Sequence, residues 1–352
     1  MPQLDKIFRT AVQYKASDIY ITTGSKPTLR INGELVAIEE HQILSKKIAE
    51  DYLLEILTDK QKEEFSKNLD LDFSLEIATI ARFRVNLFVQ RKGIAANFRV
   101  IPERVLSLDE LGLPNQIHQL TKSDRGLILV TGSTGSGKTT TLAAMINEIN
   151  NGEDAKHIIT VEDPIEYVHE NKKCVIDQRE VGTHTLSFQR ALKSALREDP
   201  DVILVGEMRD LETIALALTA AETGHLVFAT LHTNGAATSV DRIIDAFPTA
   251  QQNQIRMQLS SSLRAVVWQA LMKTKDGNGE VAGLEIMINN NAVANMIRKN
   301  KTHQLNSAIE TGSKEGMQTM KKSVTDLLEA GIIDETTALE NIPEEIDTSL
   351  NG

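Results

Sequence analysis

The first hundred residues alternate short amphipathic helices with strand-like runs, a pattern that predicts a small α+β domain over 1–100. An opening helix is indicated because four apolar residues share one face at helical spacing: Leu4, Ile7, Phe8 and Val12. Ser45 and Thr58 fit the N-caps of two later helices, since each precedes a helical pattern and can accept a backbone hydrogen bond.

Strand-like runs occupy the spaces around these helices. Five are expected, at 18–23, 28–32, 34–38, 82–90 and 95–101. Asn32-Gly33 joins two of them, and this dipeptide is typical of a tight β-hairpin. Along 82–90 apolar and polar residues alternate, so one face of that strand should be buried. Two prolines and a glycine over 101–114 indicate a linker.

After residue 115 the pattern changes to apolar runs without polar alternation, separated by helical stretches. Four runs are expected as strands: 126–131, 157–161, 202–205 and 226–229. Parallel strands that are covered on both faces have this character, so the second domain, 115–352, is predicted as a doubly wound α/β fold with a mainly parallel sheet. Helices are expected over 292–329, and 331–352 should be a helix end with a loose acidic tail.

Composition narrows the classes of protein that fit. The 352 residues allow two domains with separate cores, and the net charge of −11 argues against nucleic acid as the main partner. Cys174 is the one cysteine, which excludes an internal disulfide and a four-cysteine zinc site and favours a small buried residue. No run approaches the roughly 18 apolar residues of a transmembrane helix, and none resembles a signal peptide. A cytoplasmic protein is predicted, with peripheral docking on a membrane machine left open.

The stretch 132–139 fits the phosphate-binding pattern G-x-x-x-x-G-K-[ST] in full, between an apolar run and a helical stretch. Glycines in such a loop let backbone N–H groups close around phosphate oxygens, and the helix start adds partial positive charge. Lys138 should reach the β- and γ-phosphates and Thr139 should bind Mg²⁺, so ATP and Mg²⁺ are the predicted cofactors. The residues expected to bind nucleotide are Gly132, Ser133, Thr134, Gly135, Ser136, Gly137, Lys138, Thr139 and Thr140.

Two acidic stretches follow predicted strands. Glu207 ends an apolar strand-like run, where a carboxylate would hold the Mg²⁺ water shell or orient the attacking water. Glu162, Asp163 and Glu166 lie just past the strand 157–161. Carboxylates this close repel one another unless cations share them, so the residues alone fit either a solvated acidic turn or a metal-facing role.

Histidines and arginines supply the remaining candidates. His232 sits just past the carboxyl end of the strand 226–229 and could hydrogen-bond the γ-phosphate, whereas His225 lies at the opposite end. Four arginines crowd the first domain without obvious acidic partners: Arg82, Arg84, Arg91 and Arg99. They fit either a solvated face or arginine fingers for a neighbour's ATP, and the finger candidates are Arg82, Arg84 and Arg99.

Five segments carry a family resemblance. They are GSTGSGKTTT (132–141), ITVEDPIEYVH (159–169), DPDVILVGEMRDLETI (199–214), TGHLVFATLHTNGAATSVDRIIDAFP (223–248) and RFRVNLFVQRKGIAANFRVIP (82–102). They resemble the Walker A, aspartate box, Walker B, histidine box and arginine-bearing N-domain end of the secretion-type ATPases of type IV pili, type II secretion and type IV secretion. Ser133 departs from the family's usual proline, and the resemblance covers nearly the whole chain.

Within this family the chain is most similar to the pilus-retraction branch. Its N-domain starts almost at the first residue, and it lacks the four-cysteine zinc site usual in extension and secretion motors. AVANMIRKN (292–300) and GMQTM (316–320) resemble C-terminal elements of retraction motors. Ala294 stands where arginine is usual and Tyr20 where histidine is common, so an accessory retraction ATPase stays an alternative.

The resemblance implies a PAS-like N-terminal domain, a RecA-like P-loop domain, and a homohexamer at the cytoplasmic, inner-membrane base of a pilus. ATP would bind between two domains and touch the next subunit, and hydrolysis would drive an inner-membrane platform protein. A paralogous retraction ATPase is a second candidate partner. By matching motifs, the general base is Glu166 ahead of Glu162. Glu207 is then the Mg²⁺ and water carboxylate, and His225 and His232 are the histidine-box pair.

Two other classes of function would use the same core. A nucleic-acid motor is disfavoured by the acidic charge and by an aromatic content of 4%, which leaves no basic–aromatic track. DNA-stimulated hydrolysis would revive that class. A regulatory ring that binds ATP with little turnover is disfavoured because Lys138, Glu166 and Glu207 are all present.

Overall fold

The computed structural model describes residues 2–31, 33–78, 80–101, 104–277 and 279–342. The chain divides into two compact units. The first holds Met1–Arg104 with Pro164–Val168, and the second holds Val105–Asp163 with His169–Gly352. Residues 105–114, which the sequence analysis assigned to a linker, therefore cluster with the second unit.

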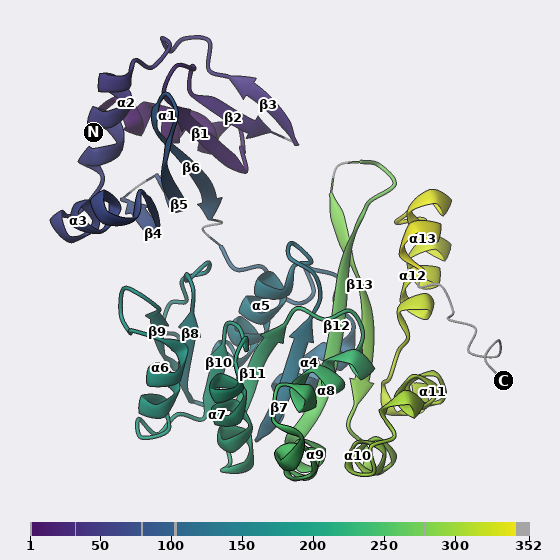
Figure 1. Ribbon diagram of the computed structural model, residues 1–352. Helices are drawn as coiled ribbons and strands as arrows, with labels where there is room; N and C mark the ends of the chain where they lie inside the picture. Colours follow the sequence, from purple (N-terminus) through teal and green to yellow (C-terminus); the bar gives the residue numbers. More distant parts are fainter. Residues whose placement is uncertain (1, 32, 79, 102–103, 278, 343–352) are drawn as a thin grey trace. The chain divides into compact units, whose positions relative to one another are not determined.

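The first unit is a six-stranded antiparallel sheet in the order β3-β2-β1-β6-β5-β4, with three helices (Figure 1). Its elements are α1 Pro2–Gln13, β1 Asp18–Thr22, β2 Thr28–Ile31, β3 Glu34–Ala37, α2 Lys46–Glu55, α3 Asp59–Asn68, β4 Asp70–Ile77, β5 Ala81–Gln90 and β6 Gly93–Ile101. Asn32 of the expected hairpin lies outside the described residues, but β2 and β3 do pair antiparallel. The predicted caps are confirmed: Ser45 accepts from the N–H of Ile48, and Thr58 forms a capping box with Gln61.

The core of this unit follows the alternation along β5. Phe83 is fully buried, and its ring centroid lies 4.6 Å from that of Phe8 on α1. Phe98 of β6 meets the same pair of rings. Val12 and Val89, which the pattern placed on buried faces, are instead 39% and 44% exposed. Each lies next to the last residue of its element, where the core no longer covers it.

The second unit contains a seven-stranded sheet in the order β13-β12-β7-β11-β10-β8-β9. All neighbouring strands are parallel except β12 and β13, so the predicted doubly wound, mainly parallel fold is confirmed. Its strands are β7 Gly126–Thr131, β8 His157–Glu162, β9 Val175–Glu180, β10 Val202–Val205, β11 Leu226–Leu231, β12 Leu263–Lys273 and β13 Glu280–Ile288. The sequence analysis did not predict β9, β12 or β13, nor β4 of the first unit.

Helices cover both faces of this sheet. They are α4 Asn115–Thr121, α5 Lys138–Asn150, α6 Phe188–Ala195, α7 Leu211–Glu222, α8 Ala236–Asp245, α9 Thr249–Ser262, α10 Asn291–Arg298, α11 Leu305–Thr311, α12 Met320–Glu329 and α13 Glu335–Asn341, with short 3-10 turns at Thr302–Gln304 and Ser313–Glu315. Among the described residues, none of the helices combines the length and apolar character needed to cross a membrane.

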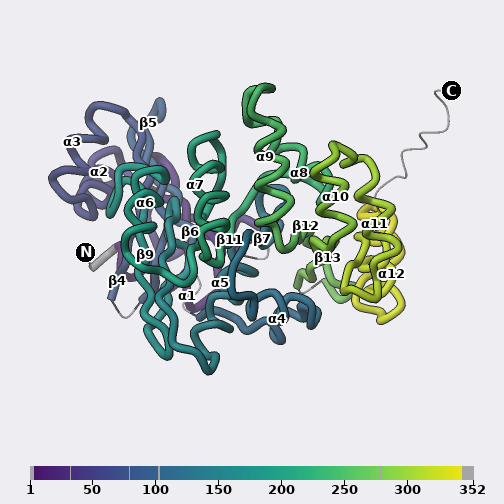
Figure 2. Tube along the Cα trace, turned by 90° about the horizontal axis from the view of Figure 1, so that it is seen from below, coloured from purple at the N-terminus to yellow at the C-terminus, as the bar shows by residue number. Residues whose placement is uncertain are grey.

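Successive residues of β7 show how the two faces are filled. Leu127 and Leu129 join a cluster with α6, α7, α8 and α9, whereas Ile128 and Val130 join another with α4 and α5. Figure 2 shows these two helix layers on opposite sides of the strands. Cys174 belongs to the second cluster and is 2% exposed, which confirms that it is a small buried residue.

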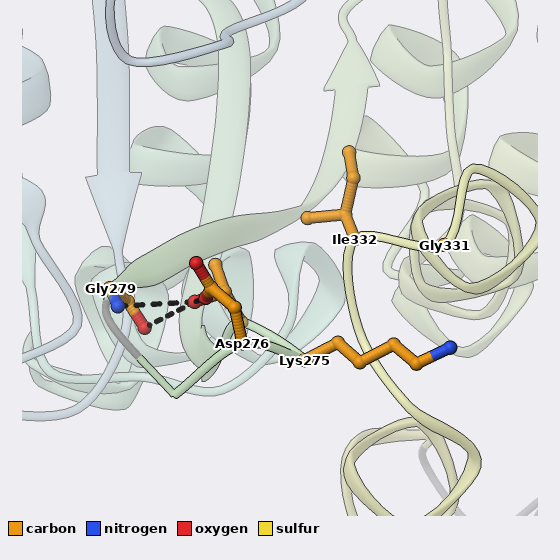
Figure 3. Close-up of a pocket in the computed structure, with 6 residues that line it drawn as sticks. Lys275, Asp276, Gly279, Gly331 and Ile332 are labelled. Carbon is orange, nitrogen blue, oxygen red and sulfur yellow. Dashed lines mark hydrogen bonds between the residues drawn. The ribbon is translucent and has the colours of Figure 1, made fainter.

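The C-terminal helices α12 and α13 pack on the β12–β13 hairpin through a small separate core that includes Met272, Met320 and Val324. Near the hairpin turn lies an open hollow of about 530 Å³. Its lining is Thr274, Lys275, Asp276, Gly279, Gly331 and Ile332. Figure 3 shows Lys275 extending away from the hydrogen-bonded turn, and the other lining residues belong to that turn and to the loop after α12. Of the stretch 331–352, predicted as a helix end with a loose acidic tail, Glu335–Asn341 form the separate helix α13, and residues 343–352 lie outside the described part of the chain.

Candidate nucleotide-binding site

The phosphate-binding loop joins β7 to α5, as the strand–loop–helix prediction required. Every residue of β7 is buried, and α5 begins at Lys138 directly after Gly137. Gly135 and Gly137 have φ angles of 81° and 83°, a region that glycine enters at little cost. The loop therefore ends at the amino terminus of a 13-residue helix, where backbone N–H groups and the helix dipole favour an anion.

Lys138 lies over the loop that precedes it. Its side chain is nearly buried, and its ammonium donates to the carbonyl oxygens of Gly132 at 2.9 Å and Ser133 at 2.7 Å. These bonds hold the cation at the start of the loop. A phosphate oxygen would be a stronger partner than a carbonyl, because both members of the pair would then be charged.

A second group of polar side chains forms where β10 and β11 end. These neighbouring strands run parallel, so their carboxyl ends meet at one edge of the sheet. Glu207 Oε1 lies 2.6 Å from Nε of Arg209 and 3.2 Å from Nε2 of His232. Burial opposes ionisation of Glu207, but the hydrogen bonds and positive charge of these two partners outweigh it and lower its pKa. Glu207 is therefore an anionic carboxylate at neutral pH.

The two candidate histidines occupy opposite ends of β11. His232 follows the carboxyl end and contacts Glu207. His225 precedes the amino end, where its Nδ1 lies 2.9 Å from the carbonyl oxygen of Ala220. The structure thus brings His232 to the carboxylate group and leaves His225 away from it within this unit. A role for His225 at the nucleotide stays a prediction that rests on the family motif alone.

Glu162 is the last residue of β8, and its surroundings differ from those of an exposed acidic turn. It is 8% exposed and accepts hydrogen bonds from Oγ1 of Thr160 at 2.6 Å and Nε2 of Gln178 at 3.2 Å. Neutral donors on β8 and β9 therefore hold this carboxylate in place. Asp163, which follows it, is exposed.

Glu166 belongs to the segment that clusters with the first unit, and there it meets one of the candidate arginines. Its Oε1 lies 3.8 Å from Nη1 of Arg84, with both side chains about one-third exposed (34% and 39%). At this exposure the pair contributes little to stability, on the order of 0–1 kcal/mol. Its interest is chemical, because it joins the predicted general base to a predicted arginine finger.

The expectation that the arginines lack acidic partners is wrong. Arg99 Nε lies 3.1 Å from Oδ1 of Asp18, and Arg84 has Glu166. The reason is strand pairing: β1 runs antiparallel to β6 and sets Asp18 directly opposite Arg99. Residues this far apart in the chain give no local sequence signal.

Arg209 was missed as a functional candidate. Its side chain is 73% exposed, yet its Nε lies closer to Glu207 Oε1 than Nε2 of His232 does. The sequence did carry a signal, because a base two residues after a strand-end carboxylate can turn back to the same edge of the sheet.

The donors at this edge fit a magnesium ion. Thr139 supplies a hydroxyl oxygen and Glu207 an anionic carboxylate, and Mg²⁺ prefers oxygen ligands. Across the part of the chain that the structure describes, no three or more His, Cys, Asp or Glu side chains are grouped as a metal site. Mg²⁺ commonly takes only one or two protein ligands and completes its shell with phosphates and water.

Comparison with known proteins also indicates a nucleotide-binding protein. Residues 1–343 match the family described as Type II/IV secretion system protein. The chain is 53% identical to the "Twitching motility protein" of Neisseria gonorrhoeae, over 91% of this chain and 86% of that protein. It is 50% identical to the "Type IV pilus retractation ATPase PilT" of Pseudomonas aeruginosa, over 94% and 95%. A crystal structure of "the Pilus Retraction Motor PilT and Bound ADP" superposes with a TM-score of 0.90, at 44% identity and 97% coverage of both chains.

Proposed function

The chain belongs to the type II/IV secretion system protein family, and we propose that it is an ATPase whose hydrolysis of ATP powers retraction of type IV pili. The observation that carries the enzymatic part is the complete P-loop between β7 and α5, with Lys138 held at its carbonyls. The names of the two bacterial relatives support retraction as the work performed.

In the proposed reaction each side chain has a defined task. Lys138 and the loop N–H groups bind the β- and γ-phosphates. Thr139 and Glu207 would hold Mg²⁺, which when bound draws charge from the phosphate oxygens. Glu166 accepts a proton from water as the water oxygen bonds to the γ-phosphorus. The bond from that phosphorus to its bridging oxygen then breaks, which leaves ADP and phosphate. His232, which lies beside Glu207, would hydrogen-bond the γ-phosphate.

The assembly in which this happens is also part of the proposal. Six copies would form a ring at the cytoplasmic base of the pilus machine, where an inner-membrane platform protein receives the motion. One arginine among Arg82, Arg84 and Arg99 would act on the nucleotide of a neighbouring subunit. Catalysis would then depend on ring geometry, which gives hydrolysis the mechanical gate that a motor needs.

The enzymatic part is tested by substituting the P-loop lysine. Lys138→Ala should reduce turnover by at least about 100-fold and weaken nucleotide binding, because it removes a cation that meets the transferring phosphate. Steady-state ATP hydrolysis and nucleotide titration measure both effects. Lys122→Ala, an exposed lysine at the end of α4, is the matched control. Near-normal turnover in Lys138→Ala would show that the P-loop assignment is wrong.

The direction of work is tested in the host. Deletion of the gene should leave excess surface pili and abolish twitching, since assembly continues without withdrawal. The wild-type gene should restore motility, and the Lys138→Ala gene should not. Loss of surface pili on deletion would identify an assembly motor, and normal motility would identify an accessory ATPase.

A further inference from the structure

Gln269 lies on β12, outside all five segments that carry the family resemblance, and it meets the P-loop at several points. Pairing between β12 and β7 ends at Trp268 and Thr131. Gln269 is therefore the first residue of β12 beyond that pairing, beside the point where β7 gives way to the loop. Its side chain is 2% exposed.

Both polar atoms of this side chain are used. Nε2 donates to the carbonyl oxygen of Ser136 at 2.7 Å, and Oε1 accepts from the hydroxyl of Thr141 at 2.8 Å. Ser136 belongs to the loop, and Thr141 belongs to the first turns of α5. One amide therefore ties the loop to the helix that follows it, which needs a side chain with a donor and an acceptor together.

Two loop glycines pack directly against the same residue. A β-carbon at Gly132 would lie 2.3 Å from the backbone oxygen of Gln269, and one at Gly137 would lie 2.7 Å from its Nε2. Real β-carbons do not approach this closely. At Gly132 the backbone of β12 leaves no room for a side chain, whereas at Gly137 a side chain would have to displace the amide end of Gln269.

The bond to Ser136 also sets the direction of a phosphate donor. A trans peptide is planar, so its carbonyl and its N–H point in opposite directions. Because the carbonyl of Ser136 points at Gln269, the N–H of Gly137 in the same peptide points away from β12. That N–H belongs to the residue that caps α5, among the groups expected to bind phosphate.

We propose that Gln269 is a positioning residue of the nucleotide site, which fixes the Ser136–Gly137 peptide against the start of α5 so that the loop N–H groups face phosphate. This inference rests on the proposed function of the P-loop. It assigns Gln269 no contact with the reacting atoms.

The test uses purified full-length protein and a fluorescent ADP analogue. Gln269→Met keeps nearly the same volume but loses both hydrogen bonds. It should raise the dissociation constant and KM about tenfold, as two net hydrogen bonds would, with a smaller fall in kcat. Thr141→Val removes the helix contact and keeps the Ser136 contact, so it should raise the dissociation constant by a smaller factor.

Gln318→Met is the matched control, because Gln318 also donates from Nε2 to a backbone carbonyl, that of Leu284 on β13. It loses one hydrogen bond rather than two, so it should lower thermal stability less than Gln269→Met and leave nucleotide affinity unchanged. Wild-type affinity in both Gln269→Met and Thr141→Val, or an equal loss in Gln318→Met, would overturn the role of Gln269. A wild-type chain that binds no nucleotide would instead overturn the proposed function of the loop.

Discussion

The two units present their candidate functional side chains in different ways. In the second unit Lys138, Glu207 and His232 follow the carboxyl ends of parallel strands. In the first unit Arg82, Arg84 and Arg99 stand within antiparallel strands. A residue past a strand end can turn toward a ligand without breaking the sheet, whereas a residue within a strand is aimed by its pleat. A functional residue at a strand end can therefore be recognised from local sequence, while the role of a charged residue within a strand depends on what that strand faces.

The largest expected effect is a loss of turnover on substitution of the first unit's arginines, and it tests whether that unit contributes to catalysis. Among the single variants Arg82→Ala, Arg84→Ala and Arg99→Ala, we expect at least one to lower turnover by about 10³–10⁵, as arginine fingers do, with nucleotide binding intact. Steady-state hydrolysis and nucleotide titration measure this. Arg91→Ala, in the turn after β5, should stay active.

Mixing experiments sharpen the same prediction. An inactive arginine-to-alanine variant mixed with Lys138→Ala subunits should regain some activity, because mixed interfaces can pair an intact P-loop with an intact arginine. No recovery, once subunit exchange is demonstrated, would mean that the arginine acts within its own subunit. Full activity in all three single variants would remove the first unit from catalysis.

The next effect distinguishes Glu162, the last residue of β8, from Glu166, which follows that strand. Glu166→Gln should lower kcat by about 10²–10⁴ with little change in nucleotide affinity, because a general base acts in the transition state. Glu162→Gln is the matched comparison, since Glu162 accepts hydrogen bonds from Thr160 and Gln178 whereas Glu166 faces Arg84. A large loss of kcat in Glu162→Gln, with none in Glu166→Gln, would exchange the two roles.

Acid stability should depend on the second unit through His169. Burial, reinforced by the charge of Lys172, lowers the pKa of His169 from 6.5 to about 4. Between pH 6.5 and about 4, His169 is therefore protonated in the unfolded chain but neutral in the folded chain. The free energy of unfolding decreases as the pH falls through this window. The loss at this site should approach about 3 kcal/mol. Denaturant unfolding as a function of pH measures it, and His169→Gln should remove this component. An unchanged pH dependence in that variant would assign the acid sensitivity to other groups.

The smallest effect belongs to the first unit and should leave catalysis untouched. Thr58→Ala removes the capping box of α3 and should cost about 1 kcal/mol of stability. Thr58→Ser keeps a hydroxyl and should retain most of it. Thermal unfolding compares the two variants. An equal loss in both would show that packing of the Thr58 methyl group, not capping, is responsible.

Much of the fold was predictable where local pattern and tertiary role agree. The buried runs of β7 and β10 were predicted with the bounds found in the structure, because parallel strands covered on both faces exclude polar residues. β12 was not predicted. Its sequence LRAVVWQALMK follows α9 directly, and an apolar run of this kind fits a buried helix as well as a strand. Pairing with β7 decides between them, and no local pattern contains that information.

In the candidate site, too, some contacts could be predicted from the order of the strands and others could not. The meeting of Glu207 with His232 follows from two strand ends on one edge of a sheet, a relation that topology alone supplies. The partner of Arg99 required knowledge that β1 pairs with β6, and the role of Gln269 required β12 itself. Apart from the local contact of Arg209 with Glu207, these missed contacts join residues that only long-range pairing brings together.

The continuity of β12 has a mechanical meaning. A single strand touches the P-loop at Gln269 and reaches the hairpin turn at Lys273, paired with β13 from Ala265 onward. The far end of that hairpin packs against the C-terminal helices. If nucleotide binding makes displacement of the hairpin less favourable by some factor, a load or a partner that displaces the hairpin weakens nucleotide binding by the same factor. This equality follows from thermodynamic linkage. Displacement of the β12–β13 hairpin and nucleotide occupancy of the P-loop would then be coupled by a single free energy.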